Sequence, residues 1–298
     1  MGDYLKQLSA DMATAATAAG NSIVRVEARR RAHASGVIYS SDGVIVTTHH
    51  VVERDENISI GLPDGTKAGA TLVGRDPSTD LAVLRVEANG LQAARWAAAE
   101  DVQVGQLVLA LGRPGERIQA TLGVISAVEE GWRTHGGGKV DAYLQTDVIM
   151  YPGFSGGPLL SANGDFIGIN SSALMRGASV TLPAATVSRV AQALLAHGHV
   201  RRGYLGVSAQ PVRLPAALAG ELGQETGLLV AAVETGSPAE NAGMLLGDTL
   251  IALADQRIRH MDDLMAALSS DRVGKTVAAR IVRGGKTEEL SVTIGERE

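Results

Sequence analysis

Two different spacings of hydrophobic residues divide the chain and predict its main elements. Over 3–19, apolar residues recur every three or four positions, which predicts an amphipathic helix that ends at Gly20. From 22 to 182, short runs rich in Val, Ile and Leu alternate with turn signals, a spacing typical of an all-β sandwich or barrel. The clearest predicted strands are 23–26, 36–39, 44–47, 58–62, 81–86, 107–111 and 122–125.

The last third of the chain combines both spacings. A helix is predicted over 184–197, with Pro183 near its start and Gly198 as its C-terminal cap. Beyond it, strands mix with two helical stretches, and one of these begins with the capping-box pattern SPAE at 237–240. We therefore expect an N-terminal helical segment (1–20), a β domain (21–200) that ends in the linker helix, and a small α+β domain (201–298).

Composition and charge exclude several classes of protein. The chain has 298 residues, of which 45% are hydrophobic, and a formal net charge of −5, which argues against nucleic acid as the main partner. It has no cysteine, so disulfides, thiolate metal sites and cysteine nucleophiles are excluded. No stretch approaches ~18 consecutive apolar residues, so no membrane span is predicted. The first residues lack the basic-then-apolar order of a secretory signal, so we expect either a cytoplasmic protein or a sequence from which an export signal has been trimmed.

A serine flanked by glycines is the sharpest local feature. Residues 152–158 read PGFSGGP, and glycine permits a tight turn that exposes the Ser155 hydroxyl. In such a turn the backbone amides of Gly153 and Ser155 can converge on a developing oxyanion. An ordinary glycine-rich β-turn explains the same residues.

A serine nucleophile needs a base and a group that orients the base. His49 and His50 follow the apolar run 44–47, where a polar pair is costly unless at least one member has a partner or a special role. Adjacent strand residues point to opposite sides, which disfavours a metal site. Of two nearby carboxylates, Asp76 precedes a proline and suits a structural turn. Asp80 stands at the mouth of an apolar strand, where pairing with a histidine would explain it.

The same serine motif also matches the G-x-S-x-G elbow of α/β-hydrolases. That fold needs a helix directly after Ser155 and draws its acid and base from later in the chain. The candidates there are Asp165, Asp255, His197 and His199. Residues 158–168 read instead as a hairpin, so the order His50, Asp80, Ser155 in an all-β segment favours the double-barrel protease arrangement.

Three segments carry a resemblance to a known family: IVTTHHVV at 45–52, GRDPSTDLAVL at 74–84 and GFSGGP at 153–158. In these motifs the chain resembles HtrA/Deg-type serine proteases, which join a trypsin-like double β-barrel to a C-terminal PDZ domain. The resemblance implies that His50 is the general base, Asp80 orients it and Ser155 is the nucleophile, with no metal or other cofactor. It also implies a homotrimer that cleaves unfolded or damaged polypeptides.

The chain departs from the family pattern near these motifs. His49 and Phe154 each stand where the family usually has Asn, and 179–183 read SVTLP where it shows GFAIP. The resemblance assigns the substrate pocket to Ile149, Asn170, Ser171 and Val180. Ile149, six residues before Ser155, occupies the pocket floor of trypsin-like enzymes, so an aliphatic P1 residue is expected rather than Arg or Lys.

The C-terminal domain carries the second part of the resemblance. Residues 203–207 read GYLGV and resemble the carboxylate-binding loop of HtrA-type PDZ domains. Successive loop amides can hold a C-terminal carboxylate while the peptide adds as a strand beside 207–210. The predicted peptide-binding residues are Tyr204, Leu205, Gly206, Val207, Leu264 and Leu268, although the last two leucines suit a plain core equally well. A peptide-binding or chaperone module with a latent protease domain is the alternative function.

Overall fold

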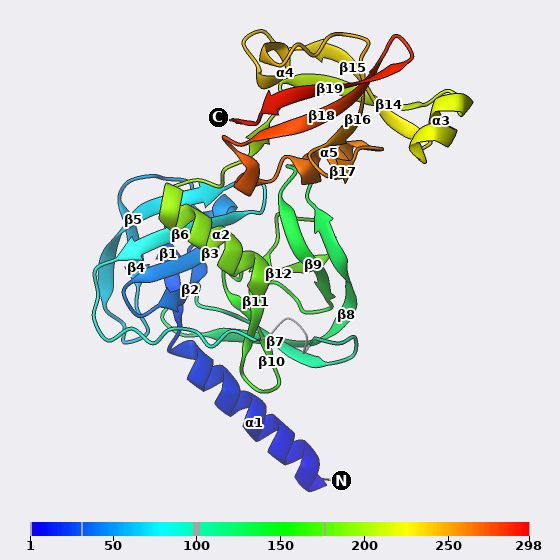
Figure 1. Ribbon diagram of the computed structural model, residues 1–298. Coiled ribbons are helices and arrows are strands. Elements are labelled where there is room, and N and C mark those ends of the chain that lie inside the picture. Colours follow the sequence, from blue (N-terminus) through cyan, green and yellow to red (C-terminus); the bar gives the residue numbers. More distant parts are fainter. Residues whose placement is uncertain (1, 31, 98–101, 176, 298) are drawn as a thin grey trace. The chain divides into compact units, whose positions relative to one another are not determined.

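The computed structural model describes residues 2–30, 32–97, 102–175 and 177–297. The chain divides into two compact units, Met1–Val200 and Arg201–Glu298. The first unit contains two closed barrels of six antiparallel strands (Figure 1), which confirms the predicted fold class. Closure pairs the strands all round and leaves no exposed sheet edge.

The strand order in the first barrel is β1-β2-β3-β6-β5-β4, and in the second it is β10-β11-β12-β9-β8-β7. The first barrel comprises β1 (Ile23–Glu27), β2 (Ala34–Ser40), β3 (Val44–Thr48), β4 (Ile58–Gly61), β5 (Lys67–Asp76) and β6 (Leu81–Val86). The second comprises β7 (Leu107–Gly112), β8 (Gln119–Arg133), β9 (Lys139–Thr146), β10 (Pro158–Ser161), β11 (Phe166–Ser171) and β12 (Ser179–Pro183). The hairpin of β10 and β11 directly after Ser155 excludes the hydrolase elbow, which requires a helix there.

The strands of the first barrel are continuous apolar runs in the sequence, and strand β3 shows why. Successive side chains of a strand point to opposite faces. Ile45 lies in the interior of the first barrel, whereas Val44 and Val46 belong to a second cluster shared with the other barrel. Because both faces of β3 are buried, no polar face interrupts the run.

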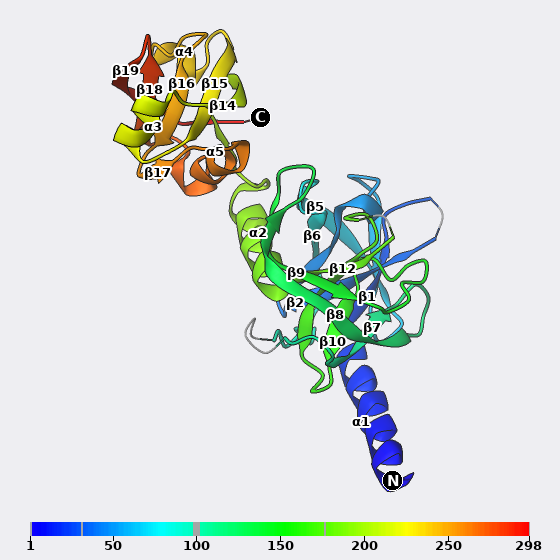
Figure 2. The same ribbon diagram turned by 90° about the vertical axis from the view of Figure 1, so that its right-hand side faces the viewer.

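Helix α2 (Ala184–His197) covers the junction of the two barrels (Figure 1) and lies along one side of them in the view of Figure 2. Its buried face, which includes Val187, Val190 and Leu194, joins the shared cluster and contacts strands of both barrels. Gly198 ends the helix in the left-handed conformation, at φ 76°, and its N–H donates to Leu194 O. The predicted bounds and cap of this helix are confirmed.

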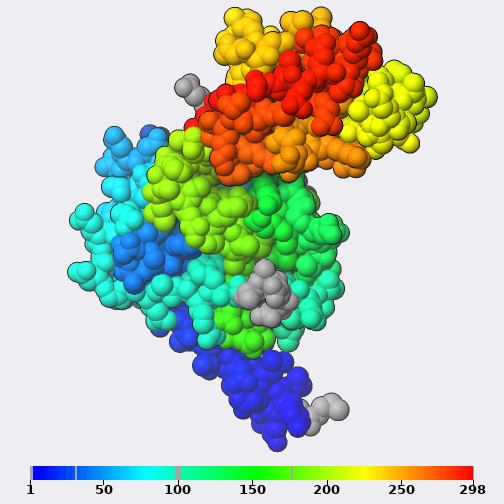
Figure 3. Space-filling view, in the orientation of Figure 1, coloured from blue at the N-terminus to red at the C-terminus, as the bar shows by residue number. Residues whose placement is uncertain are grey.

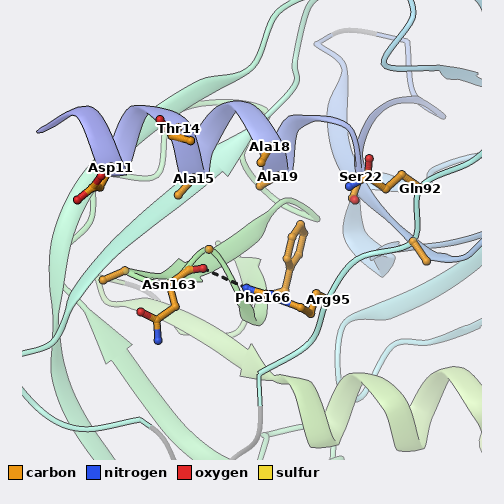
Figure 4. Close-up of a pocket in the computed structure, with 13 residues that line it drawn as sticks. Asp11, Thr14, Ala15, Ala18, Ala19, Ser22, Gln92, Arg95, Asn163 and Phe166 are labelled. Carbon is orange, nitrogen blue, oxygen red and sulfur yellow. Dashed lines mark hydrogen bonds between the residues drawn. The ribbon is translucent and has the colours of Figure 1, made fainter. Parts of the chain in front are cut away.

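Helix α1 (Gly2–Gly20) projects from the barrels (Figures 1 and 3) and confirms the predicted N-terminal helix. Its last turn is anchored by Ala19, which is buried in the shared cluster. A crevice of about 470 Å³ separates α1 from the β10–β11 turn, with Asp11 and Ala15 across from Asn163 (Figure 4). Along another part of the helix, exposed apolar side chains border a groove formed with β7 and β8.

The second unit is a small α+β domain. Its main sheet has the order β14-β15-β16-β18-β19, and β14 lies at one edge. The elements are β13 (Gly203–Tyr204), β14 (Val207–Arg213), α3 (Ala216–Leu222), β15 (Thr226–Val233), α4 (Pro238–Asn241), β16 (Thr249–Leu253), β17 (Gln256–Arg257), α5 (Met261–Ala267), β18 (Thr276–Arg283), β19 (Lys286–Thr293) and β20 (Gly295–Glu296). Ser237 caps α4 as predicted, because its hydroxyl accepts the Glu240 N–H at 3.2 Å.

Candidate active site

A tight turn delivers Ser155 to the start of β10. The Phe154 N–H donates to Tyr151 O at 3.0 Å, with Pro152 second and Gly153 third in the turn. Gly153 has φ 93°, and proline followed by such a glycine is the pattern of a type II turn. A Cβ at Gly153 would lie 2.5 Å from Pro114 Cβ, so this position has room only for glycine.

The backbone amides around Ser155 fall into two groups. Those of Phe154, Gly156 and Gly157 donate to backbone carbonyls at 2.8–3.0 Å. Those of Gly153 and Ser155, the two predicted oxyanion donors, donate to none of the residues that the structure describes. The loop therefore presents two free N–H donors on either side of Phe154, whose own side chain is fully buried in the second barrel.

His50 and Asp80 are joined by two hydrogen bonds. Asp80 Oδ2 lies 2.8 Å from His50 Nδ1, and Oδ1 accepts the His50 backbone N–H at 2.9 Å. The Ser171 hydroxyl also donates to Oδ2, at 2.5 Å. These bonds compensate the burial of the carboxylate, which is 7% exposed, and bind Nδ1 of the imidazole so that Nε2 is the nitrogen left for proton transfer.

Asp80 also has an unusual backbone. Its φ of 57° lies in the left-handed region, which Asp and Asn adopt more readily than other residues with side chains. Its carbonyl accepts the His49 N–H at 2.9 Å, so backbone and carboxylate together hold the short 3₁₀ helix His49–Val51. This geometry turns the carboxylate back toward the imidazole of His50.

His49 and His50 occupy different environments. The Nδ1 atom of His49 is buried and has no hydrogen-bond partner in the part of the chain that the structure describes. Burial lowers the pKa of His49, while the nearby Asp80 carboxylate opposes this effect. Of the pair, His50 is thus the one with a carboxylate partner.

The Ser155 hydroxyl bonds to Ser172 rather than to His50. Ser155 Oγ and Ser172 Oγ are 2.9 Å apart, and no bond to His50 Nε2 forms among the described residues. Ser172 follows Ser171, which holds Asp80, so the end of β11 links Ser155 in the second barrel to the His50–Asp80 pair in the first. Catalytic hydrogen bonds of this kind often form or tighten only when substrate binds.

The turn that carries Asp80 is held from both barrels. Asp76 accepts the Ser78 N–H at 3.1 Å and the Thr79 hydroxyl at 2.7 Å, which is the structural turn expected for this residue. From the second barrel, the Thr134 hydroxyl donates to Ser78 O at 2.6 Å. A Cβ at Gly138 would lie 2.6 Å from the Ser78 carbonyl, so the glycines of 136–138 permit close packing here.

The four predicted pocket residues are not equivalent. Ile149 is 60% exposed, whereas Val180 is fully buried. Asn170 is buried with both ends bonded, since its amide donates to Pro158 O at 2.8 Å and its oxygen accepts the Thr181 hydroxyl at 2.9 Å. With Ser171 engaged by Asp80, only Ile149 presents its side chain to solvent.

The predicted peptide-binding loop lies beside the free edge of the second unit's sheet. The N–H groups of Leu205 and Gly206 have no acceptor among the residues described in this unit. Gly206 has φ 80°, and a Cβ there would lie 2.2 Å from Ser237 Cβ. Tyr204 donates its hydroxyl to the Glu234 carboxylate. Leu205 and Leu264 are core residues, whereas Leu268 is half-buried.

The residues that the structure describes contain neither a metal-binding cluster nor a membrane-spanning helix. No cluster of three His, Asp or Glu side chains is arranged to bind a metal ion there. None of the helices described is both long and apolar enough to span a bilayer.

Comparison with known proteins identifies the class. Residues 34–169 match the family of trypsin-like peptidase domains, and residues 203–294 match PDZ domains. The structure of the HtrA-type protease AlgW with tripeptide superposes with a TM-score of 0.78 at 32% identity, covering 96% of this chain and 97% of that one. The serine endoprotease from Yersinia pestis gives 0.79 at 30% identity, covering 95% and 97%. The chain therefore belongs to the HtrA family of serine proteases, as the three sequence motifs indicated.

Curated relatives agree in class but are longer. A probable periplasmic DegP-like serine endoprotease of Chlamydia trachomatis is 37% identical over 276 residues, which cover 91% of this chain and 55% of the relative. The corresponding protein of Halomonas elongata is 37% identical over 273 residues, covering 90% and 57%. The chain thus spans about half the length of these relatives. Their names place them in the periplasm, which contradicts the cytoplasmic location expected from the first residues.

The lowered pKa of His49 predicts how stability changes with pH. The unfolded chain protonates His49 near its ordinary value of 6.5, before the folded chain does, so the unfolded state binds more protons below that pH. The free energy of unfolding therefore falls as pH drops from 7.5 to 5.5, and His49→Asn removes part of that fall. Urea denaturation of both proteins at the two pH values measures it. An equal fall in both proteins would contradict the prediction.

Proposed function

We propose that this chain is a serine endopeptidase in which Ser155 is the nucleophile, His50 the general base and Asp80 the residue that orients His50. The observation that carries this proposal is the 2.8 Å contact of Asp80 Oδ2 with His50 Nδ1, tied to Ser155 through Ser171 and Ser172. The two free amides of Gly153 and Ser155 supply an oxyanion hole beside it.

The proposed reaction follows from these positions. As Ser155 Oγ attacks the substrate carbonyl, His50 Nε2 accepts its proton and later delivers it to the leaving amine. The carboxylate of Asp80 stabilises the imidazolium that forms between these steps. The N–H groups of Gly153 and Ser155 stabilise the negative oxygen of the tetrahedral intermediate, and water then hydrolyses the acyl-enzyme.

The proposed substrates are unfolded or damaged polypeptides, which present extended backbone to the site. The exposed Ile149 supports an apolar specificity residue and thus an aliphatic P1 side chain. We also propose a periplasmic location, which the names of the curated relatives support.

Replacement of the nucleophile tests the proposed activity. Ser155→Ala is expected to lower the rate of casein degradation at least ~10³-fold and to abolish labelling by a fluorophosphonate probe. Ser161→Ala, which removes a hydroxyl from the β10–β11 hairpin, serves as the control and should retain both. If wild type and Ser155→Ala degrade casein equally, the assignment of the nucleophile is wrong. Wild-type protein that binds casein without cleaving it would favour the chaperone alternative.

The second unit is proposed to bind the free C-terminus of a peptide. The amides of Leu205 and Gly206 support this role because they are donors without an acceptor in the described chain, and β14 offers an edge for an added strand. On Ser155→Ala protein, a fluorescent peptide that ends in a valine carboxylate should bind at least ~10-fold more tightly than its C-terminal amide. Fluorescence anisotropy measures both affinities. Equal affinities would show that the carboxylate is not recognised.

We propose that the chain forms a homotrimer through α1 and the groove that this helix forms with β7 and β8. Leu5, Leu8 and Met12 line this groove together with Leu109 and Leu122, and Tyr4 is exposed beside it. Exposed apolar surface of this kind favours association.

The trimer proposal is testable by mass in solution. Analytical ultracentrifugation should give three times the 30.8 kDa of the chain for the wild type and a monomer for the double variant Leu5→Asp, Leu8→Asp. Gln7→Asp introduces one negative charge on the same helix outside the groove and should leave the trimer intact. A wild type that sediments as a monomer would reject the proposal.

A further inference from the structure

Ser35, near the start of β2, contacts both sides of the turn that carries Ser155. Its hydroxyl donates to Gly153 O at 2.6 Å, and its backbone N–H donates to Ser155 O at 3.1 Å. Its own carbonyl accepts the Thr47 hydroxyl at 2.7 Å. Ser35 is fully buried, so these are bonds in a site shielded from water.

The direction of the hydroxyl bond is imposed by Arg113. The Arg113 backbone N–H can only donate, and it lies 2.7 Å from Ser35 Oγ. Ser35 Oγ therefore accepts from Arg113, and its single proton is available for Gly153 O.

The backbone of Arg113 is itself held by its own side chain. The buried guanidinium donates to three backbone carbonyls, those of Gly20, Ile23 and Glu116, at 2.6–2.8 Å. The Arg113 backbone N–H, which orients the Ser35 hydroxyl, is thus held in place by bonds from the same residue to the end of α1 and to β1.

The two residues that Ser35 holds, Gly153 and Ser155, are those whose free amides are the proposed oxyanion donors. The peptide between Gly153 and Phe154 is fixed at its oxygen by Ser35 and at its nitrogen by Tyr151 O. The peptide between Ser155 and Gly156 is fixed at its oxygen by the Ser35 N–H and at its nitrogen by Asn170 O. Gly153 and Ser155 supply the proposed donors. Ser35 therefore restrains the peptide group that follows each of these two residues.

The packing around Ser35 leaves little room for another arrangement. A Cβ at Gly156 would lie 2.1 Å from Ser35 O, and one at Gly112 would lie 3.1 Å from Ser35 Oγ. Removal of the hydroxyl would leave Gly153 O and the Arg113 N–H buried without this partner. A buried unpaired group is unfavourable, and rotation of the turn is the available way to relieve it.

We propose that Ser35 is a positioning residue for the oxyanion hole, which aims the amides of Gly153 and Ser155 through the carbonyls of the same two residues. It touches neither substrate nor the reacting atoms. This inference rests on the proposed proteolytic function, since it concerns how well that site stabilises the transition state.

The test compares Ser35→Ala with Thr186→Val in the full chain. Thr186 is a matched control because its hydroxyl is also fully buried, accepts one backbone N–H, from Asp141 at 2.8 Å, and donates one bond, to the Asp141 carboxylate at 2.9 Å. It lies at the start of α2, away from the Ser155 turn. Both variants are expected to lower the melting temperature, which reports the loss of a buried hydrogen bond.

Kinetics with fluorescein-labelled casein separate positioning from stability. Ser35→Ala should lower kcat ~10- to 100-fold with KM within twofold of wild type, because a misaimed donor weakens only the transition state. The rate constant for fluorophosphonate labelling of Ser155 should fall in parallel. Thr186→Val should keep both rates within twofold of wild type below its melting temperature.

Three results would overturn the inference. The first is a kcat and a labelling rate of Ser35→Ala within twofold of those of Thr186→Val. The second is a rise in the KM of Ser35→Ala without a change in its kcat, and the third is an equal loss of kcat in both variants. If Ser35→Ala does not fold, Ser35→Cys replaces it, since a thiol is a weaker donor, and kcat is then expected between those of wild type and Ser155→Ala. Unchanged kcat in Ser35→Cys would also overturn the inference. If the wild-type protein does not react at Ser155, the proposed proteolytic function is wrong. That result is distinct from a reactive wild type in which Ser35→Ala has no effect, which would reject only the role of Ser35.

Discussion

The buried carboxylate of Asp80 is the constraint on which the rest of the site depends. A charged group at the junction of two apolar barrels is stable only if donors surround it, and here they are the imidazole and backbone of His50 and the hydroxyl of Ser171. Removal of one of these donors would leave a carboxylate oxygen buried without that partner, which is unfavourable. The fold must therefore bring β11 of the second barrel to the β5–β6 turn of the first.

That requirement explains how residues far apart in the sequence reach one place. Ser171 holds Asp80 while its neighbour Ser172 contacts Ser155, so one strand end connects the two halves of the proposed site. Ser35, on β2 of the first barrel, holds the Ser155 turn from the other side. The proposed active site is thus built from contacts between the barrels rather than within either one, and the apolar cluster shared by the barrels and α2 keeps those contacts in register.

Local sequence patterns predicted the helices and strands whose bounds are set by interactions between neighbouring residues. Helix 184–197, its cap at Gly198 and the strand 81–86 have the predicted bounds, because each combines a clear apolar period with a strong stop signal. The full length of β8 was not predicted because many of its residues are exposed. Strand β9 was not predicted because Asp141 and Gln145 interrupt its apolar residues and leave no continuous run. The residues themselves indicated the order His50, Asp80, Ser155, and the family resemblance assigned their roles, but no local pattern indicated Ser35 or Ser172. Ser35 and Ser172 bond to partners that lie 118 and 17 residues away in the sequence. Such contacts cannot be recognised from the spacing of hydrophobic residues. Likewise, the burial of Val180 and Asn170 depends on barrel closure rather than on their neighbours in sequence.

A crystal structure of the protein after reaction with a peptidyl boronic acid would show whether Ser155 and the two loop amides act on one substrate group. We expect boron bonded to Ser155 Oγ, with one boronate oxygen within about 2.7–3.1 Å of the amide nitrogens of Gly153 and Ser155. We also expect His50 Nε2 to turn to the adduct while Nδ1 keeps its bond to Asp80. An adduct on another residue, or an adduct whose oxygens contact neither amide, would show that the site does not work in the proposed way.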